Sequence, residues 1–186
     1  SEEALEILKT KKNGKFIIID MNNEYYNMIL HSGWNESKEI YGIKLTQKNN
    51  IYRHTFDDIY DINNRIDHVL ANCALKYAQS NNISMAVNGQ VIGMGCGQQN
   101  RVGCVKLAGE KAQNWILRQS ESALDFWNNN LGDIKRQDRI NMLYDFLETN
   151  KNKIKTSTYN IVLASDGFFP FTDNITLADR YGVRHI

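Results

Sequence analysis

The sequence predicts an α/β protein with a layered mixed sheet that carries helices on both faces. Segments with helical spacing of apolar residues alternate with short segments rich in Ile and Val. Asn88-Gly89 separates two of the short segments and is a strong hairpin signal, so one strand pair is antiparallel. The length of 186 residues suits a core of real size, and we expect a single domain over residues 1–186.

The first third of the chain predicts fewer regular elements than the rest. A helix over residues 2–11 is expected to end at Asn13-Gly14, because these residue types tolerate the left-handed conformation that closes helices. The apolar run 16–20 then predicts a strand. The other expectations are an irregular segment at 21–35, a half-buried strand at 39–47 and a polar loop at 48–62.

The remainder shows a clearer alternation of helices and strands. Apolar spacing predicts a helix over residues 64–79, and small residues on the next helix, from about Arg101, are expected to let it approach the sheet closely. Residues 119–135 predict a surface excursion, with residues 124–127 as an alternative helical extension. The other expected elements are strands 83–87, 90–94, 160–164 and 183–186, and helices 138–147 and 175–181.

Composition excludes several kinds of partner. The formal net charge of +1 gives no reason for a broad electrostatic attraction to nucleic acid or to a membrane surface. No apolar run approaches the roughly 18 residues that a membrane helix needs, and the first residues do not resemble a signal peptide. We therefore expect a cytoplasmic protein that binds neither nucleic acid nor a membrane. The cysteines lack framework spacing, which favours reduced, buried thiols at Cys73, Cys96 and Cys104.

Several catalytic and metal-binding patterns are missing from the sequence. A zinc deaminase needs a His-x-Glu motif together with Pro-Cys-x-x-Cys, and neither is present, so we expect no zinc. A Ser–His–Asp signature is also absent. The histidines share no ligand spacing and are expected to be surface or structural residues: His31, His54, His68 and His185.

The glycine-rich sequence Gly93-x-Gly95-x-Gly97 precedes a predicted helix, and two interpretations of it stay open. Its spacing fits neither a dinucleotide fingerprint nor a Walker loop. The small residues could serve strand packing and a tight turn. Alternatively, residues 97–101 present free backbone N–H groups at the positive end of a helix, where they would bind an anion or a developing oxyanion.

Two further segments are candidates for a ligand site. Asn81 lies at a helix–strand junction, where it could cap backbone groups or bind a ligand. The aromatic segment 168–171 follows Asp166-Gly167 at the carboxyl end of a predicted strand, the edge at which open α/β sheets bind ligands. With Asp173 beside it, this segment would suit a flat, amino-bearing heterocycle, and ordinary core packing is the alternative.

Four motifs, in order along the chain, match one protein family. They are Lys76-Tyr77-x-Gln79-Ser80-Asn81, Asn88-Gly89-Gln90-Val91-Ile92-Gly93, Gly97-Gln98-Gln99-x-Arg101-Val102-x-Cys104 and Ser165-Asp166-x-Phe168-Phe169-Pro170-Phe171-x-Asp173-Asn174. The family that they resemble is AICAR transformylase, the C-terminal part of the bifunctional purine-biosynthesis protein. The opening segment 2–14 fits the same family, so the resemblance spans nearly the whole chain.

The resemblance implies a role in formyl transfer from 10-formyltetrahydrofolate to the 5-amino group of AICAR, in purine (IMP) biosynthesis. The family contains two cytidine-deaminase-like subdomains without zinc, and this chain looks like most of the second one, truncated at both ends. A homodimer with active sites between the subunits is implied as well. The alternative is a non-catalytic remnant that binds folate or a nucleotide, or that scaffolds another subunit.

The same resemblance implies roles for individual residues. Asn81 matches the active-site asparagine near the reacting amine and formyl group, and Arg101 matches a catalytic position facing the formyl oxygen. A potassium ion is implied near Ser80 and Asp166. The residues matched to substrate binding are Gln98, Gln99 and Val102, with Phe168, Pro170 and Phe171 as the folate-pocket wall and Asp173 and Asn174 as the edge that reads the pterin amino group.

Part of the family's machinery has no counterpart in the sequence. The adjacent Lys-His catalytic pair, the Ala-Pro-Ser-Gly segment and the cyclohydrolase domain are not present. We therefore expect the 186-residue polypeptide on its own to show negligible turnover.

Overall fold

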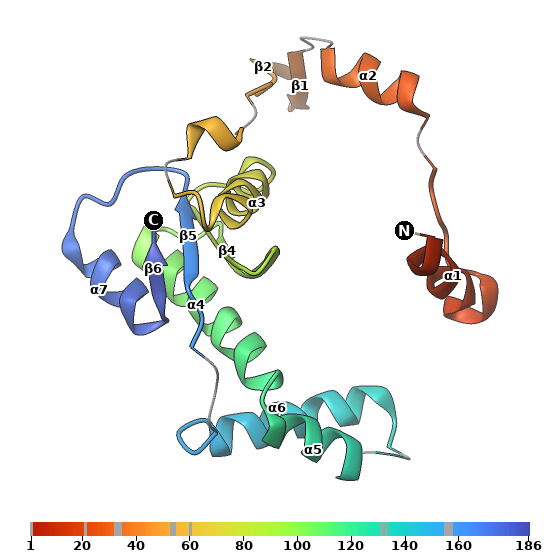
Figure 1. Ribbon diagram of the computed structural model, residues 1–186. Coiled ribbons are helices and arrows are strands. Elements are labelled where there is room, and N and C mark those ends of the chain that lie inside the picture. The colour runs from red at the N-terminus through yellow and green to blue at the C-terminus, as the bar shows by residue number, and fades with distance from the viewer. Residues whose placement is uncertain are drawn as a thin grey trace. The chain divides into compact units, whose positions relative to one another are not determined.

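The computed structural model confirms a mixed α/β protein with two sheets (Figure 1). It describes residues 2–20, 22–31, 35–52, 55–59, 61–130, 132, 134–154 and 158–186. The chain divides into two compact units, residues 1–52 and 53–186, and each is described by itself. His54 lies outside the described residues.

The first unit contains short elements, and its described residues form no buried core. Strands β1 and β2 form an antiparallel hairpin in which Ile40 pairs with Ile43, and the described residues of both strands are exposed. Helix α1 also has no buried residue. The elements of this unit are α1 (Glu2–Thr10), the 3-10 turn η1 (Lys11–Gly14), α2 (Asn23–His31), β1 (Asn35–Ile40) and β2 (Ile43–Lys48).

Three predictions for this unit were wrong. The apolar run 16–20 forms no strand, because no described segment pairs with its backbone and a strand needs a ladder partner. The segment 21–35 is not irregular, since most of it is helix α2. The half-buried strand at 39–47 is a hairpin turn with two exposed arms. Tyr41 and Gly42 have φ angles of 51° and 77°, which suit the two central positions of a tight hairpin turn.

The second unit holds a four-stranded sheet in the order β4-β3-β5-β6. Strand β3 is antiparallel to β4 and β5, and β5 is parallel to β6, so the sheet is mixed as predicted. The segment 119–135, predicted as a surface excursion, is largely helix α5. The elements are η2 (Phe56–Asp58), α3 (Arg65–Lys76), β3 (Asn82–Val87), β4 (Gln90–Cys96), α4 (Arg101–Arg118), α5 (Glu121–Asn130), α6 (Arg136–Asn150), β5 (Ile161–Ser165), α7 (Thr172–Arg180) and β6 (Val183–His185).

Helices cover both faces of this sheet. Side chains alternate along β3, so successive residues pack against helices on opposite faces. Ile83 and Met85 join the main core with residues of α4 and α7. Ala86 instead packs with Ala71 and Leu75 of α3. A third cluster lies between α5 and α6, which run side by side in Figure 1.

Helix α4 approaches strand β4 closely because two glycines of the strand have no side chain. A Cβ atom on Gly93 would lie 2.1 Å from the backbone oxygen of Ala108, and one on Gly95 would lie 2.2 Å from that of Cys104. The packing interpretation of the glycine-rich sequence therefore holds for these two glycines. Gly109, on the same helix, instead leaves room for the Tyr181 ring, 2.2 Å from its would-be Cβ.

Asp67 of α3 holds the hairpin between β3 and β4. Its buried carboxylate accepts the backbone N–H of Asn88 at 3.0 Å and that of Gly89 at 2.7 Å. Replacing Asp67 with alanine should lower the free energy of unfolding by about 1.5–3 kcal/mol, because both donors lose a charged partner. Urea denaturation measures the change. The exposed Asp125→Ala is the control, and equal midpoints for the two variants would contradict the assigned role.

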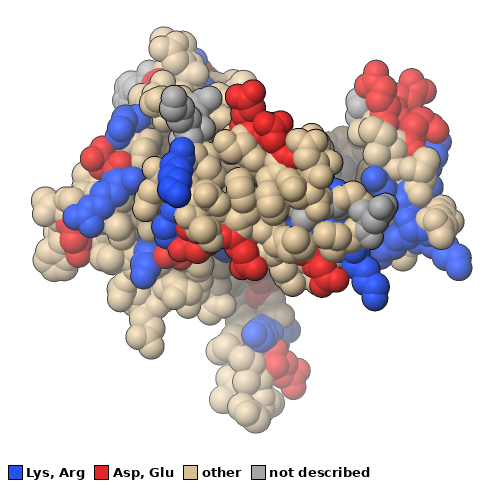
Figure 2. All heavy atoms as spheres, turned by 90° about the horizontal axis from the view of Figure 1, so that it is seen from below, with Lys and Arg blue, Asp and Glu red and all other residues tan. Residues whose placement is uncertain are grey.

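The charge distribution agrees with the small net charge. On the face drawn in Figure 2, acidic and basic side chains both occur in small groups among uncharged ones, and neither sign covers the face. Among the described residues, no helix combines the length and apolarity needed to cross a bilayer.

Candidate functional site

The predicted site residues gather at one end of the strands of the four-stranded sheet, and we call this end the sheet edge. Strand β3 begins at this edge while its antiparallel neighbours β4 and β5 end there, in the register Asn82–Cys96 and Ile83–Ser165. The segments that leave the strands therefore meet: the α3–β3 junction, the start of α4 and the loop after β5. Gly97 joins two of them, because its N–H lies 2.9 Å from the backbone oxygen of Asn81.

Asn81 is fixed by contacts on both its backbone and its side chain. Its side-chain nitrogen donates to the backbone oxygens of Gln98 at 3.2 Å and Gln99 at 3.4 Å. Its own backbone oxygen accepts from the Cys104 thiol at 3.1 Å. These contacts set the amide orientation, so the side-chain oxygen is the atom left to accept from a ligand. The Ser80–Asn81 peptide bond is cis.

The first turn of α4 presents backbone donors at this edge. Asn100 is the N-cap, and its side chain accepts the N–H of Gly103 at 2.7 Å. The next N–H, that of Cys104, bonds to the Asn100 backbone oxygen. The N–H groups of Arg101 and Val102 precede the first helical bonds, so they lack an intrahelical partner and lie at the positive end of the helix dipole.

Arg101 lies against the loop that follows β5. Its guanidinium donates to one oxygen of Asp166 at 3.3 Å, and the Ser80 hydroxyl donates to the other. The Arg101 and Asp166 side chains are only 27% and 18% exposed. Arg101 Nε is buried without a partner among the described residues. A Cβ on Gly167 would lie 2.3 Å from Arg101 Nη2, so this glycine makes room for the guanidinium.

This arrangement does not suit a potassium ion at Ser80 and Asp166. Both carboxylate oxygens of Asp166 already accept hydrogen bonds, and the Arg101 guanidinium stands where a cation would be attracted. A bound cation would face repulsion from that fixed positive charge. The potassium site stays a prediction from the resemblance.

The loop after β5 exposes an aromatic surface. Phe168 is 82% exposed and Phe171 is 71% exposed, so neither belongs to the core, whereas Phe169 packs against it. At the start of α7, the Asp173 carboxylate accepts hydrogen bonds from the backbone N–H and the side-chain amide of Asn174. Asn174 itself is only 3% exposed. The Asn174 amide therefore supports Asp173 and does not face solvent.

Sequence reasoning missed two supports of this edge. The sequence indicated only that Gly167 breaks the strand after Asp166. Arg101 lies far from Gly167 along the chain, so nothing in the linear sequence indicates that the two residues pack together. Cys104 was expected to be one of three buried thiols, but only Cys104 is buried, while Cys73 and Cys96 are exposed. Its contact with Asn81 follows from the approach of α4 to β4.

Burial raises the pKa of the Cys104 thiol, and the Asp166 charge adds to the effect. Less of the reactive thiolate is then present at pH 8. We expect iodoacetamide to alkylate the exposed Cys73 and Cys96 first and Cys104 much more slowly, with a rate that keeps rising as the pH increases. Mass spectrometry of digested samples measures the order. In denaturant all three should react alike, and equally fast modification of Cys104 in the native chain would contradict the structure.

The chain is similar to known proteins over its whole length. A family model described as AICARFT/IMPCHase bienzyme matches residues 1–111. Among curated relatives, the bifunctional purine biosynthesis proteins PurH of Prochlorococcus marinus strains MIT 9301 and MIT 9515 are 29% and 30% identical over 192 residues. Each alignment covers 100% of this chain and 28% of the relative, so the chain spans under a third of the length of these proteins. The four motifs, the family model and the relatives agree: the chain belongs to the AICARFT/IMPCHase bienzyme family.

Proposed function

We propose that the chain supplies the folate-binding and oxyanion-binding side of an AICAR transformylase active site. The reaction moves a formyl group from 10-formyltetrahydrofolate to the 5-amino group of AICAR during purine biosynthesis. One observation carries the proposal most strongly: the backbone donors of Arg101 and Val102, the Arg101 guanidinium and the Asn81 amide lie at the same sheet edge. Family membership supports the choice of reaction.

The chemistry explains why such an edge is useful. The AICAR amine is a poor nucleophile, because its lone pair is delocalised into the ring and the carboxamide. Its nitrogen bonds to the formyl carbon and loses a proton, the bond from that carbon to folate N10 breaks, and N10 gains a proton. The formyl oxygen carries negative charge in between. Donors held at a helix start, where they need no reorganisation, would stabilise that charge.

Each residue of the edge has a place in this proposal. The Asn81 side-chain oxygen accepts an N–H of the attacking amine, because its nitrogen is already engaged with Gln98 and Gln99. Arg101 offers positive charge to the formyl oxygen. The exposed Phe168, Pro170 and Phe171 would stack against the pterin, with Asp173 at its amino edge.

The proposal includes several properties implied by the family. They are a cytidine-deaminase-like fold without zinc, a homodimer with active sites between subunits, and a cytoplasmic location. Proton transfer is assigned to no residue of this chain, since the Lys-His pair of the family has no counterpart in the sequence. The PurH segments that this chain does not span would bring that pair to the strand ends where α4 and the loop after β5 meet.

The test uses the chain alone and the chain completed with the PurH segments that it does not span. We expect the chain alone to bind 10-formyltetrahydrofolate, measured by titration calorimetry, without forming product. The completed enzyme should release tetrahydrofolate when AICAR is added, measured by absorbance. Folate binding without turnover in the completed enzyme would favour the non-catalytic alternative, and the absence of folate binding in both samples would overturn the proposal.

A further inference from the structure

Asp166 lies between an arginine and a serine at the sheet edge. Its Oδ1 accepts a hydrogen bond from Arg101 Nη2 at 3.3 Å, and its Oδ2 accepts one from the Ser80 hydroxyl. The backbone N–H of Asp166 also donates to the Asn82 oxygen at 3.4 Å, which continues the pairing of β5 with β3. The carboxylate is therefore held on both of its oxygens by residues that are 65 and 86 positions away along the chain.

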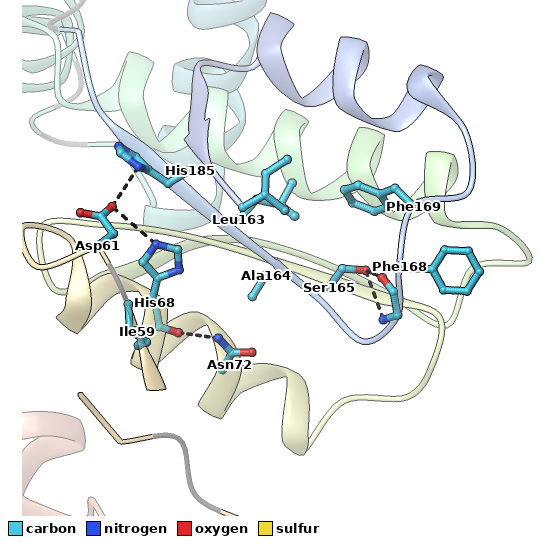
Figure 3. A pocket seen from close by; sticks show the side chains of 12 residues that line it. Ile59, Asp61, His68, Asn72, Leu163, Ala164, Ser165, Phe168, Phe169 and His185 are labelled. Atoms are coloured by element: carbon cyan, nitrogen blue, oxygen red, sulfur yellow. Dashed lines mark hydrogen bonds and ion pairs between the residues drawn. The ribbon is translucent and has the colours of Figure 1, made fainter. Parts of the chain in front are cut away.

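The backbone at Gly167 confines the same guanidinium from a second side. A Cβ on Gly167 would lie 2.3 Å from Arg101 Nη2 and 2.8 Å from Arg101 Cζ, so the loop backbone passes close to the guanidinium. Ser165 keeps this backbone in a tight turn, because its hydroxyl donates to the Gly167 oxygen at 2.7 Å (Figure 3). The guanidinium thus lies against a carboxylate and a backbone segment that are both held by hydrogen bonds.

Asp166 orients the Arg101 side chain. Among the described residues, only Asp166 forms a hydrogen bond or ion pair with this side chain, and Arg101 Nε is buried without a partner. A guanidinium has five N–H donors, so the bond to Asp166 leaves others for a ligand. An arginine side chain has many rotamers, and without a fixed partner the guanidinium would sample several of them.

Ser80 limits how far Asp166 weakens the positive charge of Arg101. A carboxylate that engaged the guanidinium with both oxygens would offset much of its charge toward a ligand. Here one oxygen faces Arg101, whereas the other accepts from a neutral hydroxyl. The distance of 3.3 Å also exceeds the roughly 2.7–2.9 Å of tight charge-assisted bonds. This geometry suits a carboxylate that holds the guanidinium in place and leaves its charge available.

We propose that Asp166 is a positioning residue for formyl transfer: it holds the Arg101 guanidinium in the orientation that faces the formyl oxygen, and it touches no substrate itself. The inference rests on the function proposed above. It gives the carboxylate a role other than the potassium ligation that the resemblance implies, since both of its oxygens have partners within the chain. Such a role affects the rate, because a displacement of about 1 Å in a catalytic geometry can cost about 100-fold.

The first test observes the guanidinium without turnover. In the chain with ¹⁵N-labelled arginine, the Arg101 signals are assigned by their loss in Arg101→Lys. We expect separate Nη signals in the unchanged chain, because a held guanidinium rotates slowly, and one averaged signal in Asp166→Ala. The exposed Asp125→Ala is the control and should leave the signals separate. Averaged signals in the unchanged chain, or separate ones in Asp166→Ala, would overturn the proposal.

The second test moves the guanidinium without removing any group, in the enzyme completed with the PurH segments. Gly167→Ala adds a methyl group where Arg101 Nη2 lies. We expect kcat to fall about tenfold while KM for 10-formyltetrahydrofolate stays within about twofold, because the displaced group acts on the formyl oxygen and not on the pterin. Asp166→Ala should behave alike, and Asp166→Asn, which keeps an oxygen acceptor, should recover part of the rate. Gly132→Ala is the control and should leave both constants unchanged.

A double variant separates positioning from an independent role. In an Arg101→Ala background, Asp166→Ala should cost nothing further, because Asp166 acts through Arg101. Additive losses, or a Gly167→Ala enzyme with unchanged kcat, would contradict the assignment. If the completed enzyme without substitutions shows no turnover, the proposed function fails, and the Arg101 signals still decide whether Asp166 holds the guanidinium.

Discussion

Gly95→Ala is expected to destabilise the second unit by about 3 kcal/mol, an effect at the upper end for overpacking. The added methyl group would lie 2.2 Å from the backbone oxygen of Cys104. A backbone carbonyl within a helix cannot swing aside as a long side chain can. Helix α4 would have to move away from β4, which would open the main core around Val105 and Ala108.

Denaturation in guanidinium chloride measures this loss. Gly132→Ala is the matched control, because a Cβ there meets no described atom within 4 Å, and its midpoint should stay close to that of the unchanged chain. Gly93→Ala should behave like Gly95→Ala, since its Cβ would lie 2.1 Å from the Ala108 oxygen. If Gly95→Ala unfolded at the same denaturant concentration as Gly132→Ala, the close approach of α4 would be wrong.

Replacing Arg101 with alanine should lower kcat/KM for formyl transfer by about 100-fold in the completed enzyme. The guanidinium is held by Asp166 beside the N–H groups of the first helical turn. Its loss removes a positive charge placed for the developing oxyanion and, among the described residues, leaves the carboxylate of Asp166 with the Ser80 hydroxyl as its remaining side-chain partner. Arg101→Lys keeps the charge and should recover part of the rate.

A structural effect of the same substitution is separated by two further measurements. The thermal midpoint of Arg101→Ala should stay within a few degrees of the starting protein, because the side chain lies at the sheet edge and not in the core. Lys106→Ala, on the exposed side of α4, should keep full activity. An Arg101→Ala enzyme that turns over at the original rate would remove this residue from the site.

The sequence predicted the second unit well because its elements carry strong local signals. Helix α3 has apolar residues at helical spacing, and the Asn88-Gly89 turn defines the hairpin of β3 and β4. The first unit gave poorer predictions. An apolar run such as residues 16–20 favours a strand only if another strand is present to pair with it, and that partner cannot be read from local pattern. Helix α5 was predicted only as an alternative over residues 124–127, because its Asn-rich sequence has weak helix propensity and packing against α6 outweighs it.

The place of Asn81 and of the start of α4 could be predicted from local sequence, because junction residues and helix N-termini have recognisable patterns. Their roles remain predictions from the family resemblance. The cluster of Asp61, His68 and His185, in which the carboxylate lies 2.9 Å from His185 Nδ1 and 3.6 Å from His68 Nε2, was missed. Its two histidines are separated by more than a hundred positions, and only the pairing of β5 with β6 and the packing of α3 bring them together.

The backbone contact between α4 and β4 has a consequence for how the site can move. A helix that rests on a strand through side chains can shift by small changes of rotamer, but here the carbonyl oxygens of Cys104 and Ala108 sit directly over Gly95 and Gly93. The first turn of α4 therefore cannot shift relative to the sheet without a clash. Any adaptation to the size or orientation of a bound molecule falls to the loop with its exposed aromatic rings. Differences in ligand selectivity should then arise from substitutions in that loop, while the donors at the helix start keep their position.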